Sequence, residues 1–259
     1  MDLKYINFRS QGGIGWVQFN RPEKLNAINP EVLNDLEKVV VRCEKDDAVR
    51  VVVLMGNEKA FVAGADVKNM ANGDSKLAYD LTGLTMRVQE GLAGLSKPTI
   101  AAISGYALGA GCEMALCCDF RIAADNAVLG LPEITLGIIP GGGGTQRLPR
   151  LVGLSSAAEM VFLGETIKAD KAERIGLVNK VVSSDLLEDE VKALASRLMK
   201  RPFLAICAAK TAMCEGLNTS LKEGLQIEQD QFCRLFGTED QIEGMTAFIE
   251  KRKPSFKGK

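Results

Sequence analysis

The sequence contains no histidine. This absence excludes Ser-His-Asp and Cys-His catalytic arrangements and any metal site built on histidine ligands, and we expect no metal site. An excess of positive charge is also lacking, because 32 Lys and Arg stand against 33 Asp and Glu, for a net charge of −1. A near-neutral chain is not typical of proteins that bind nucleic acid or anionic membranes.

Long apolar runs are missing as well, since none approaches the roughly 20 residues needed to cross a bilayer. The segment Met1–Tyr5 has neither the apolar stretch of a secretion signal nor an Arg-rich transit pattern. The seven cysteines form no C-x-x-C pair, so we expect reduced, buried, small apolar residues. Together these features favour a cytoplasmic protein without a membrane partner.

What the sequence does contain is enough apolar material for a sizeable core. It has 259 residues, of which 46% are hydrophobic, and this length suits one large domain or one domain with an appendage. Short apolar segments alternate with amphipathic helical patterns, which predicts an α/β layered core. The predicted strands are residues 14–19, 50–55, 99–104 and 119–124, and residues 56–66 are expected to form a glycine-containing loop.

The strand pattern stops at about Ser184, and helical patterns continue to the end. Ser220 with Glu223, and Thr238 with Gln241, have the spacing of capping boxes. We therefore expect an α/β core over residues 1–200 and a helical region over 201–259. The last helix carries an apolar face that is more often packed than free, which predicts a homo-oligomer; its residues are Ile242, Met245, Phe248 and Ile249.

The glycine clusters do not match nucleotide-binding motifs. Gly109-Ala110-Gly111 begins a G-x-G-x-x-G pattern, but Met114 stands at the third position. Gly144 is followed by Thr145-Gln146, so there is no Walker lysine. Two interpretations stay open: tight turns with close packing, or helix starts whose backbone N–H groups hold an oxyanion.

Two glutamates stand in apolar surroundings. Glu113 lies in the least polar predicted helix, and Glu133 directly follows Pro132. Acids are favoured in the first turn of a helix by about 0.3–1 kcal/mol, which is one explanation. The other is acid–base catalysis, for which a chain without histidine needs carboxyl groups in apolar settings.

Three ordered segments resemble the enoyl-CoA hydratase (crotonase) family: residues 60–68 (AFVAGADVK), 97–113 (KP to GYALGAGCE) and 131–148 (LPE to GTQRL). The resemblance extends from Asn20 to Lys253. It implies an α/β fold, a crotonase-like spiral of ββα units, with a helical C-terminal region that serves oligomerisation. It also implies a homotrimer, or a homohexamer built as a dimer of trimers.

The resemblance further implies reversible hydration of a trans-2-enoyl-CoA to the 3-hydroxyacyl-CoA, a step of fatty-acid metabolism. No cofactor is expected, because coenzyme A is part of the substrate. The positions that match the family's catalytic acids are Glu113 and Glu133, and those that match its oxyanion-hole N–H groups are Ala65 and Ala110. The positions expected to bind coenzyme A are Lys24, Ala63, Ala65, Asp66, Val67, Lys68, Phe248 and Lys251.

One departure from the family pattern keeps alternatives open. Leu131 stands where many short-chain hydratases have glutamine, so hydration of a cyclic dienoyl-CoA or branched enoyl-CoA is a second hypothesis. A Δ3,Δ2-enoyl-CoA isomerase is a third, although isomerases commonly keep only the later acid. A non-catalytic RNA-binding protein is a fourth, against which the net charge and the two intact glutamates both argue.

Overall fold

The computed structural model describes residues 2–259, with Asn69 described by its backbone only. The chain divides into two compact units. The first comprises residues up to Leu95 together with Thr99–Lys192, and the second comprises Ser96–Pro98 with Ala193–Lys259. The division therefore falls within helix α7 (Leu187–Met199).

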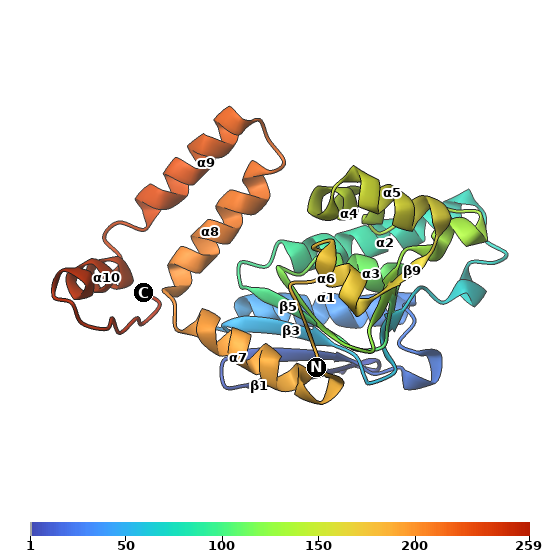
Figure 1. The fold of residues 1–259 in the computed structure, drawn as a ribbon, viewed down its shortest axis with the longest axis horizontal. Helices are drawn as coiled ribbons and strands as arrows, with labels where there is room; N and C mark the ends of the chain where they lie inside the picture. The colour runs from blue at the N-terminus through green and yellow to red at the C-terminus, as the bar shows by residue number, and fades with distance from the viewer. Residues whose placement is uncertain (1) are drawn as a thin grey trace. The chain divides into compact units, whose positions relative to one another are not determined.

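A six-stranded sheet forms the larger layer of the first unit (Figure 1). Strand β1 pairs antiparallel with β2, and the remaining strands run parallel to one another. The apolar segment predicted at residues 50–55 is central strand β3, buried on both faces, as expected for a parallel sheet. In spatial order the strands are β1 (Ile6–Gln11), β2 (Ile14–Phe19), β3 (Val51–Met55), β5 (Thr99–Ile103), β7 (Phe120–Ala124) and β10 (Lys180–Val182).

The second sheet of this unit has four short strands, of which the first three are parallel. In order they are β4 (Ala60–Ala63), β6 (Tyr106–Leu108), β8 (Val128–Gly130) and β9 (Thr166–Lys168). Three times along the chain, a strand of the large sheet is followed by a strand of the small sheet and then by a helical segment. These passages are β3-β4-α2 (Ser75–Ala93), β5-β6-α3 (Ala110–Leu116) and β7-β8-η3 (Pro132–Leu136), which confirms the spiral of ββα units.

The loop expected over residues 56–66 is partly wrong, because its centre is strand β4. Gly56 and Gly64 flank that strand and conceal it in the sequence. A Cβ atom on Gly56 would overlap the backbone at Ala60, so this glycine permits the close approach of the two segments. Strands of three or four residues are too short to show alternation, and for this reason β6, β8 and β9 also escape prediction.

Helix α1 (Pro30–Lys45) begins at a local capping signal in the sequence, Asn29-Pro30. The Asn29 side chain accepts a hydrogen bond from Val32 N at 2.9 Å, and Pro30 occupies the first turn. Its apolar face is buried, and it packs beside α2, which Asp74 caps. The remaining segments of the first unit are η1 (Pro22–Lys24), η2 (Val67–Asn69), α4 (Gly144–Val152), α5 (Leu154–Leu163), α6 (Ala169–Arg174) and η4 (Ser184–Leu186).

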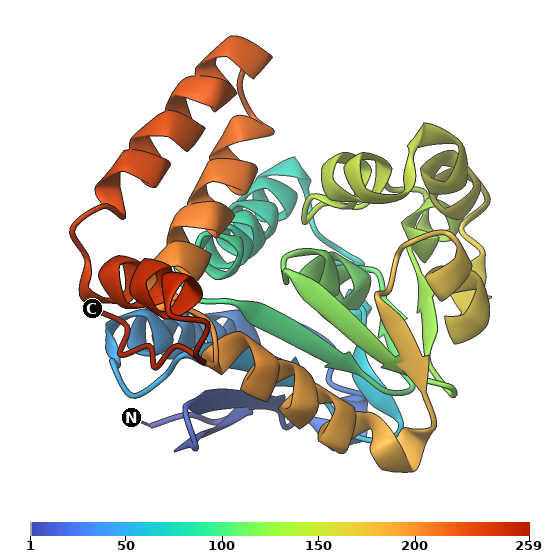
Figure 2. The same cartoon turned by 60° about the vertical axis from the view of Figure 1, so that its left-hand side comes forward.

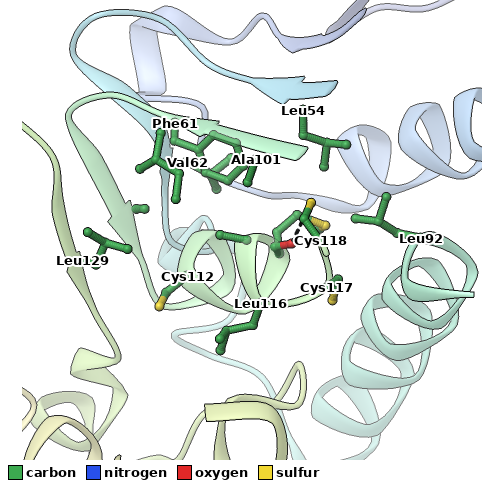
Figure 3. Close-up of a cluster of buried hydrophobic side chains, with 14 of the residues drawn as sticks. Leu54, Phe61, Val62, Leu92, Ala101, Cys112, Leu116, Cys117, Cys118 and Leu129 are labelled. Atoms are coloured by element: carbon green, nitrogen blue, oxygen red, sulfur yellow. Dashed lines mark hydrogen bonds between the residues drawn. The ribbon is translucent and has the colours of Figure 1, made fainter. Parts of the chain in front are cut away.

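Helix α3 lies in the core beneath the strands, and apolar side chains surround it (Figure 3). Cys112 of α3 is buried, and so are Cys117 and Cys118, which directly follow the helix. Cys43 of α1 is buried as well. The expectation of buried cysteines is wrong for Cys214 and Cys233, which are exposed, and Cys207 is half-buried. These three stand on helices of the second unit, where less of each helix is covered.

The second unit contains α8 (Phe203–Gly216), α9 (Leu221–Arg234) and α10 (Glu239–Ile249), with α8 and α9 side by side in both views (Figures 1 and 2). The capping box of Ser220 and Glu223 is confirmed. At the start of α10 only one of the two capping-box hydrogen bonds forms: Thr238 Oγ1 accepts from Gln241 N, but the Gln241 side chain accepts from Gly237 N instead of Thr238 N. Across residues 2–259, no helix is long and apolar enough to cross a membrane.

Candidate active site

Three neighbouring parallel strands of the small sheet end at one edge. Strand β4 leads into Gly64-Ala65, β6 leads into Gly109-Ala110, and β8 leads into Leu131-Pro132-Glu133. The carboxyl ends of parallel strands commonly gather functional loops. Segments far apart in the sequence, including most of the predicted site residues, therefore meet at this edge.

Two glycines form the turns that bring backbone N–H groups together. Gly64 has φ of +91° and Gly109 has φ of +49°, conformations that favour glycine. A Cβ atom on Gly109 would lie only 3.7 Å from Gly64 Cα, so the two turns are in contact. The residues that follow them, Ala65 and Ala110, are the predicted oxyanion donors.

Neither alanine N–H takes part in the hydrogen bonds within α3 or in those between Ile28 and the end of β4. Ala110 is the first residue of α3, so its N–H has no acceptor within the helix. Ile28 bonds Gly64 O and Asp66 N, each at 2.8 Å, and the N–H of the intervening Ala65 faces the opposite side, that of β6. Two amide donors at one sheet edge form the kind of arrangement that stabilises an oxyanion.

Glu113 lies one turn into α3 and is only 2% exposed. Its Oε1 accepts hydrogen bonds from the backbone N–H groups of Gly142 and Gly144, both at 2.8 Å. Burial raises the pKa of this carboxyl, while the two N–H groups and the positive charge of Arg147 oppose the rise. Both of these hydrogen bonds end on Oε1, so Oε2 takes part in neither of them.

The glycine run before α4 is what allows this contact. A Cβ atom on Gly142 would lie 2.6 Å from Glu113 Oε2, and one on Gly144 would lie 3.0 Å from Oε1 and 2.9 Å from Leu131 Cδ1. Any side chain there would displace the carboxyl group. From the sequence, this glycine run could be either a tight turn or a segment whose N–H groups hold an anion. In the structure, the N–H groups of Gly142 and Gly144 bind the Glu113 carboxylate of the protein itself.

Glu133 lies in the short helix η3, next to the turn at Gly109. A Cβ atom on Gly109 would lie 2.7 Å from Glu133 Oε1. Glu133 Oε2 is buried, and it finds no hydrogen-bond partner within the described chain. Burial raises the pKa of Glu133 to about 7, and the nearby negative charge of Glu113 adds to the rise. A carboxyl group with that pKa can release or take up a proton at neutral pH.

Residues predicted to bind coenzyme A lie around the end of β4. Ala63 is the last residue of that strand, and its N–H donates to Leu25 O at 3.0 Å, next to Lys24 of η1. Val67 and Lys68 are exposed in η2. The structure therefore brings Lys24, Ala63, Val67 and Lys68 to one region of the first unit.

Asp66 is committed to an ion pair within the protein. Its carboxylate accepts from Arg21 Nη2 at 2.9 Å, and that hydrogen bond lowers the pKa of Asp66. Phe248 and Lys251 belong to the second unit, and their part in binding coenzyme A stays a prediction.

Sequence reasoning missed two further side chains beside Glu113. Gln89 of α2 is fully buried, and Arg147 of α4 donates to Gly142 O at 3.1 Å and to Gln89 Oε1 at 3.5 Å. The sequence did carry an indication of the first, because Gln89 stands with Val88 and Leu92 on the buried face of an amphipathic helix.

Comparison with known proteins places the chain among well-defined relatives. A family model described as enoyl-CoA hydratase/isomerase matches residues 9–259. A crotonyl-CoA hydratase of Syntrophomonas wolfei is 47% identical over 257 residues, covering 99% of each chain. A short-chain-enoyl-CoA hydratase of Clostridium acetobutylicum is 43% identical, covering 98% of this chain and 97% of the relative. The crystal structure of an enoyl-CoA hydratase from Bacillus anthracis superposes with a TM-score of 0.94 at 39% identity, covering 99% of this chain and 100% of the other.

Proposed function

The chain belongs to the enoyl-CoA hydratase/isomerase family, and on this premise we propose that it catalyses the reversible hydration of a short trans-2-enoyl-CoA to the 3-hydroxyacyl-CoA. It is a hydro-lyase, an enoyl-CoA hydratase. The names of the two relatives support a short, unbranched acyl chain. Leu131, the departure from the common family pattern, is fully buried against the glycine run.

The proposed chemistry uses two carboxyl groups and two backbone donors. Glu113 Oε2 accepts a proton from water as the water oxygen attacks C3 of the enoyl group. Negative charge then moves to the thioester oxygen, where the N–H groups of Ala65 and Ala110 stabilise it. Glu133 delivers a proton to C2, so that one water is added in total, and proton exchange between the two carboxyls and solvent restores the starting state.

The observation that carries this proposal is the pairing of two unlike glutamates at one strand edge. Glu113 is held by two N–H groups, whereas Glu133 has an unpartnered Oε2 and a pKa of about 7. Hydration needs one carboxyl that accepts a proton and one that gives a proton, and different environments separate those roles. An arrangement that only satisfied helix ends would not leave a carboxylate oxygen buried and unbonded.

A steady-state assay with crotonyl-CoA tests the proposal through the ultraviolet absorbance of the conjugated thioester. We expect turnover by the unaltered chain and a loss of about 10²–10⁴-fold in both Glu113→Gln and Glu133→Gln. Glu228→Gln, at an exposed position of the second unit, serves as the control and retains full activity. If Glu113→Gln keeps most activity on a 3-enoyl-CoA while Glu133→Gln abolishes it, the chain is an isomerase instead.

The same assay addresses the acyl group. Rejection of crotonyl-CoA together with turnover of a cyclic dienoyl-CoA or a branched enoyl-CoA would replace the short-chain assignment by one of those alternatives.

The proposal also includes a cytoplasmic location, and assembly as a trimer or hexamer through the helical C-terminal region. The exposed apolar face of α10 supports the assembly, since Phe248 is 86% and Ile249 78% exposed in the single chain.

A further inference from the structure

Gln89 is a buried amide with an unused donor. The side chain is 0% exposed, yet its Nε2 finds no hydrogen-bond partner in the described part of the chain. A buried, unbonded amide N–H costs about 1–3 kcal/mol. Such a group in the core calls for a physical explanation, and its surroundings supply one.

Arg147 fixes the orientation of this amide. A guanidinium group only donates hydrogen bonds, and Arg147 Nη1 lies 3.5 Å from Gln89 Oε1 and 3.1 Å from Gly142 O. The opposite amide orientation would place an NH₂ group against the guanidinium and an oxygen toward a carboxylate. The amide oxygen therefore faces Arg147, and the amide N–H groups face away from it.

The free N–H groups point to the region of Glu113. A Cβ atom on Gly142 would lie 2.8 Å from Gln89 Nε2, 3.0 Å from Gln89 Oε1 and 2.6 Å from Glu113 Oε2, so the amide and this carboxylate oxygen converge on the same side of this glycine. The N–H of Gly142 meanwhile donates to Glu113 Oε1. Oε2, the oxygen that takes up a proton in the proposed reaction, is thus the one that faces Gln89.

We propose that Gln89 is a positioning residue for the reaction: oriented by Arg147, it donates its Nε2–H toward Glu113 Oε2 across one water, and holds Glu113 in its ionised form. The inference rests on the proposed function, because it assigns Glu113 the task of accepting a proton. A donor aimed at a carboxylate stabilises the charged state and offsets part of the cost of burial.

Other groups around Glu113 are consistent with this assignment. Arg147 of α4 contributes positive charge, and Glu133 of η3 contributes negative charge. The neighbouring thiols of Cys112 and Cys117 stay neutral, because burial raises the pKa of each to about 12. On α2 itself the nearest charged residues, Arg87 and Glu90, are exposed, whereas Gln89 is buried beside Gly142.

Gln89→Met tests the proposal, because methionine has a similar length and volume but cannot donate. We expect the acid limb of the kcat/KM profile for crotonyl-CoA to move to higher pH, with a loss of about tenfold at pH 6 and twofold or less at pH 9. Gln89→Glu, which places a second carboxylate beside Glu113, moves the limb further. Val88→Ala, a buried change on the same helix, leaves the position of the limb unchanged.

A second measurement does not depend on turnover. In protein labelled with ¹³C at glutamate carboxyls, the resonance that disappears in Glu113→Gln reports the titration of Glu113. Its midpoint moves to higher pH in Gln89→Met if the proposal holds. An unmoved midpoint and an unmoved acid limb would overturn it, as would a change confined to KM for longer acyl chains. Inactivity of the unaltered protein on every enoyl-CoA would instead remove the proposed function, while the NMR titration would still decide the role of Gln89.

Discussion

At the scale of single residues, Gly109 joins the two halves of the proposed chemistry. Its left-handed backbone presents Ala110 N–H at the start of α3, and its missing side chain leaves room for the Glu133 carboxylate. Both properties belong to glycine alone, since a side chain would be strained at this φ and would also press on the carboxylate. One substitution therefore affects the acid and the oxyanion donors together.

We expect Gly109→Ala to lower kcat by about 100-fold, because displacing a reacting group by about 1 Å has that effect, and to reduce the free energy of unfolding by roughly 1–2 kcal/mol. Gly176→Ala is the matched control. Its φ of +77° is also left-handed, but nothing lies within 4 Å of the added Cβ. The control should lose similar stability in urea titrations while keeping full turnover, and an equal loss of activity in both variants would contradict the prediction.

The pKa of Glu133 makes stability depend on pH with a known sign. The folded pKa of about 7 exceeds the ordinary value of 4.5, so from pH 4.5 to 7 the unfolded chain releases this proton while the folded chain retains it. The folded state thus loses stability as the pH rises through that window. Below the window the carboxyl is neutral in both states, and above it the cost stays constant.

Glu133→Gln removes the ionisable group and with it the loss of folding stability that ionisation of this buried carboxyl causes. We expect the Tm of the variant relative to the unaltered protein to be higher at pH 8 than at pH 5 by roughly 2–4 °C. Scanning calorimetry at the two pH values measures the difference, with the exposed Glu228→Gln as a control that shows none. A pH-independent difference between Glu133→Gln and the unaltered protein would argue against the raised pKa.

At the scale of elements, the short helix α3 is closed at its end by a buried cation. Arg121 is 5% exposed, and its guanidinium donates to the carbonyl oxygens of Ala115, Cys118 and Leu177. The contacts with Ala115 and Cys118 lie at the C-terminal end of the helix that carries Glu113, where a positive charge is also favourable.

Arg121→Leu removes the guanidinium donors from these buried carbonyls, so we expect the free energy of unfolding to fall by about 3 kcal/mol. Arg121→Lys recovers only part of the loss, since a point charge cannot reproduce the planar set of donors. Chemical denaturation provides the measurement. Arg87→Leu, which removes an exposed ion pair with Glu37, should change stability by less than about 0.5 kcal/mol, and an equal effect of both substitutions would sink the capping role.

Elements also differ in how far sequence predicts them. The buried strand at Val51–Met55 and the helix capped by Asn29 follow from composition and spacing, because each has a local physical cause. The three-residue strands β6, β8 and β9 do not, since their formation depends on pairing with distant strands. Glu113 and Glu133 could be nominated from their apolar surroundings, whereas the role of Gly142 and Gly144 required knowing which residues the fold places opposite them.

At the scale of the whole molecule, the second unit carries a large exposed apolar surface on α10. Light scattering should give a mass of three or six times 27.9 kDa, and we expect Ile249→Glu to lower it, because the change buries a charge in the contact. Lys222→Glu introduces the same charge at an exposed polar position and should leave the mass unchanged. A monomeric mass for the unaltered chain would exclude this assembly.

The absence of histidine combines with the raised pKa of Glu133 to make the molecule a poor buffer near neutrality. Apart from any terminal amine, Glu133 is the described group whose pKa is placed near 7. Proton uptake or release by the whole protein between pH 6 and 8 therefore reports chiefly on the site, where burial raises the pKa of both Glu113 and Glu133. Calorimetric titration of a CoA thioester in two buffers of different ionisation enthalpy would count protons at the reacting site itself, without a probe, a label or an altered residue.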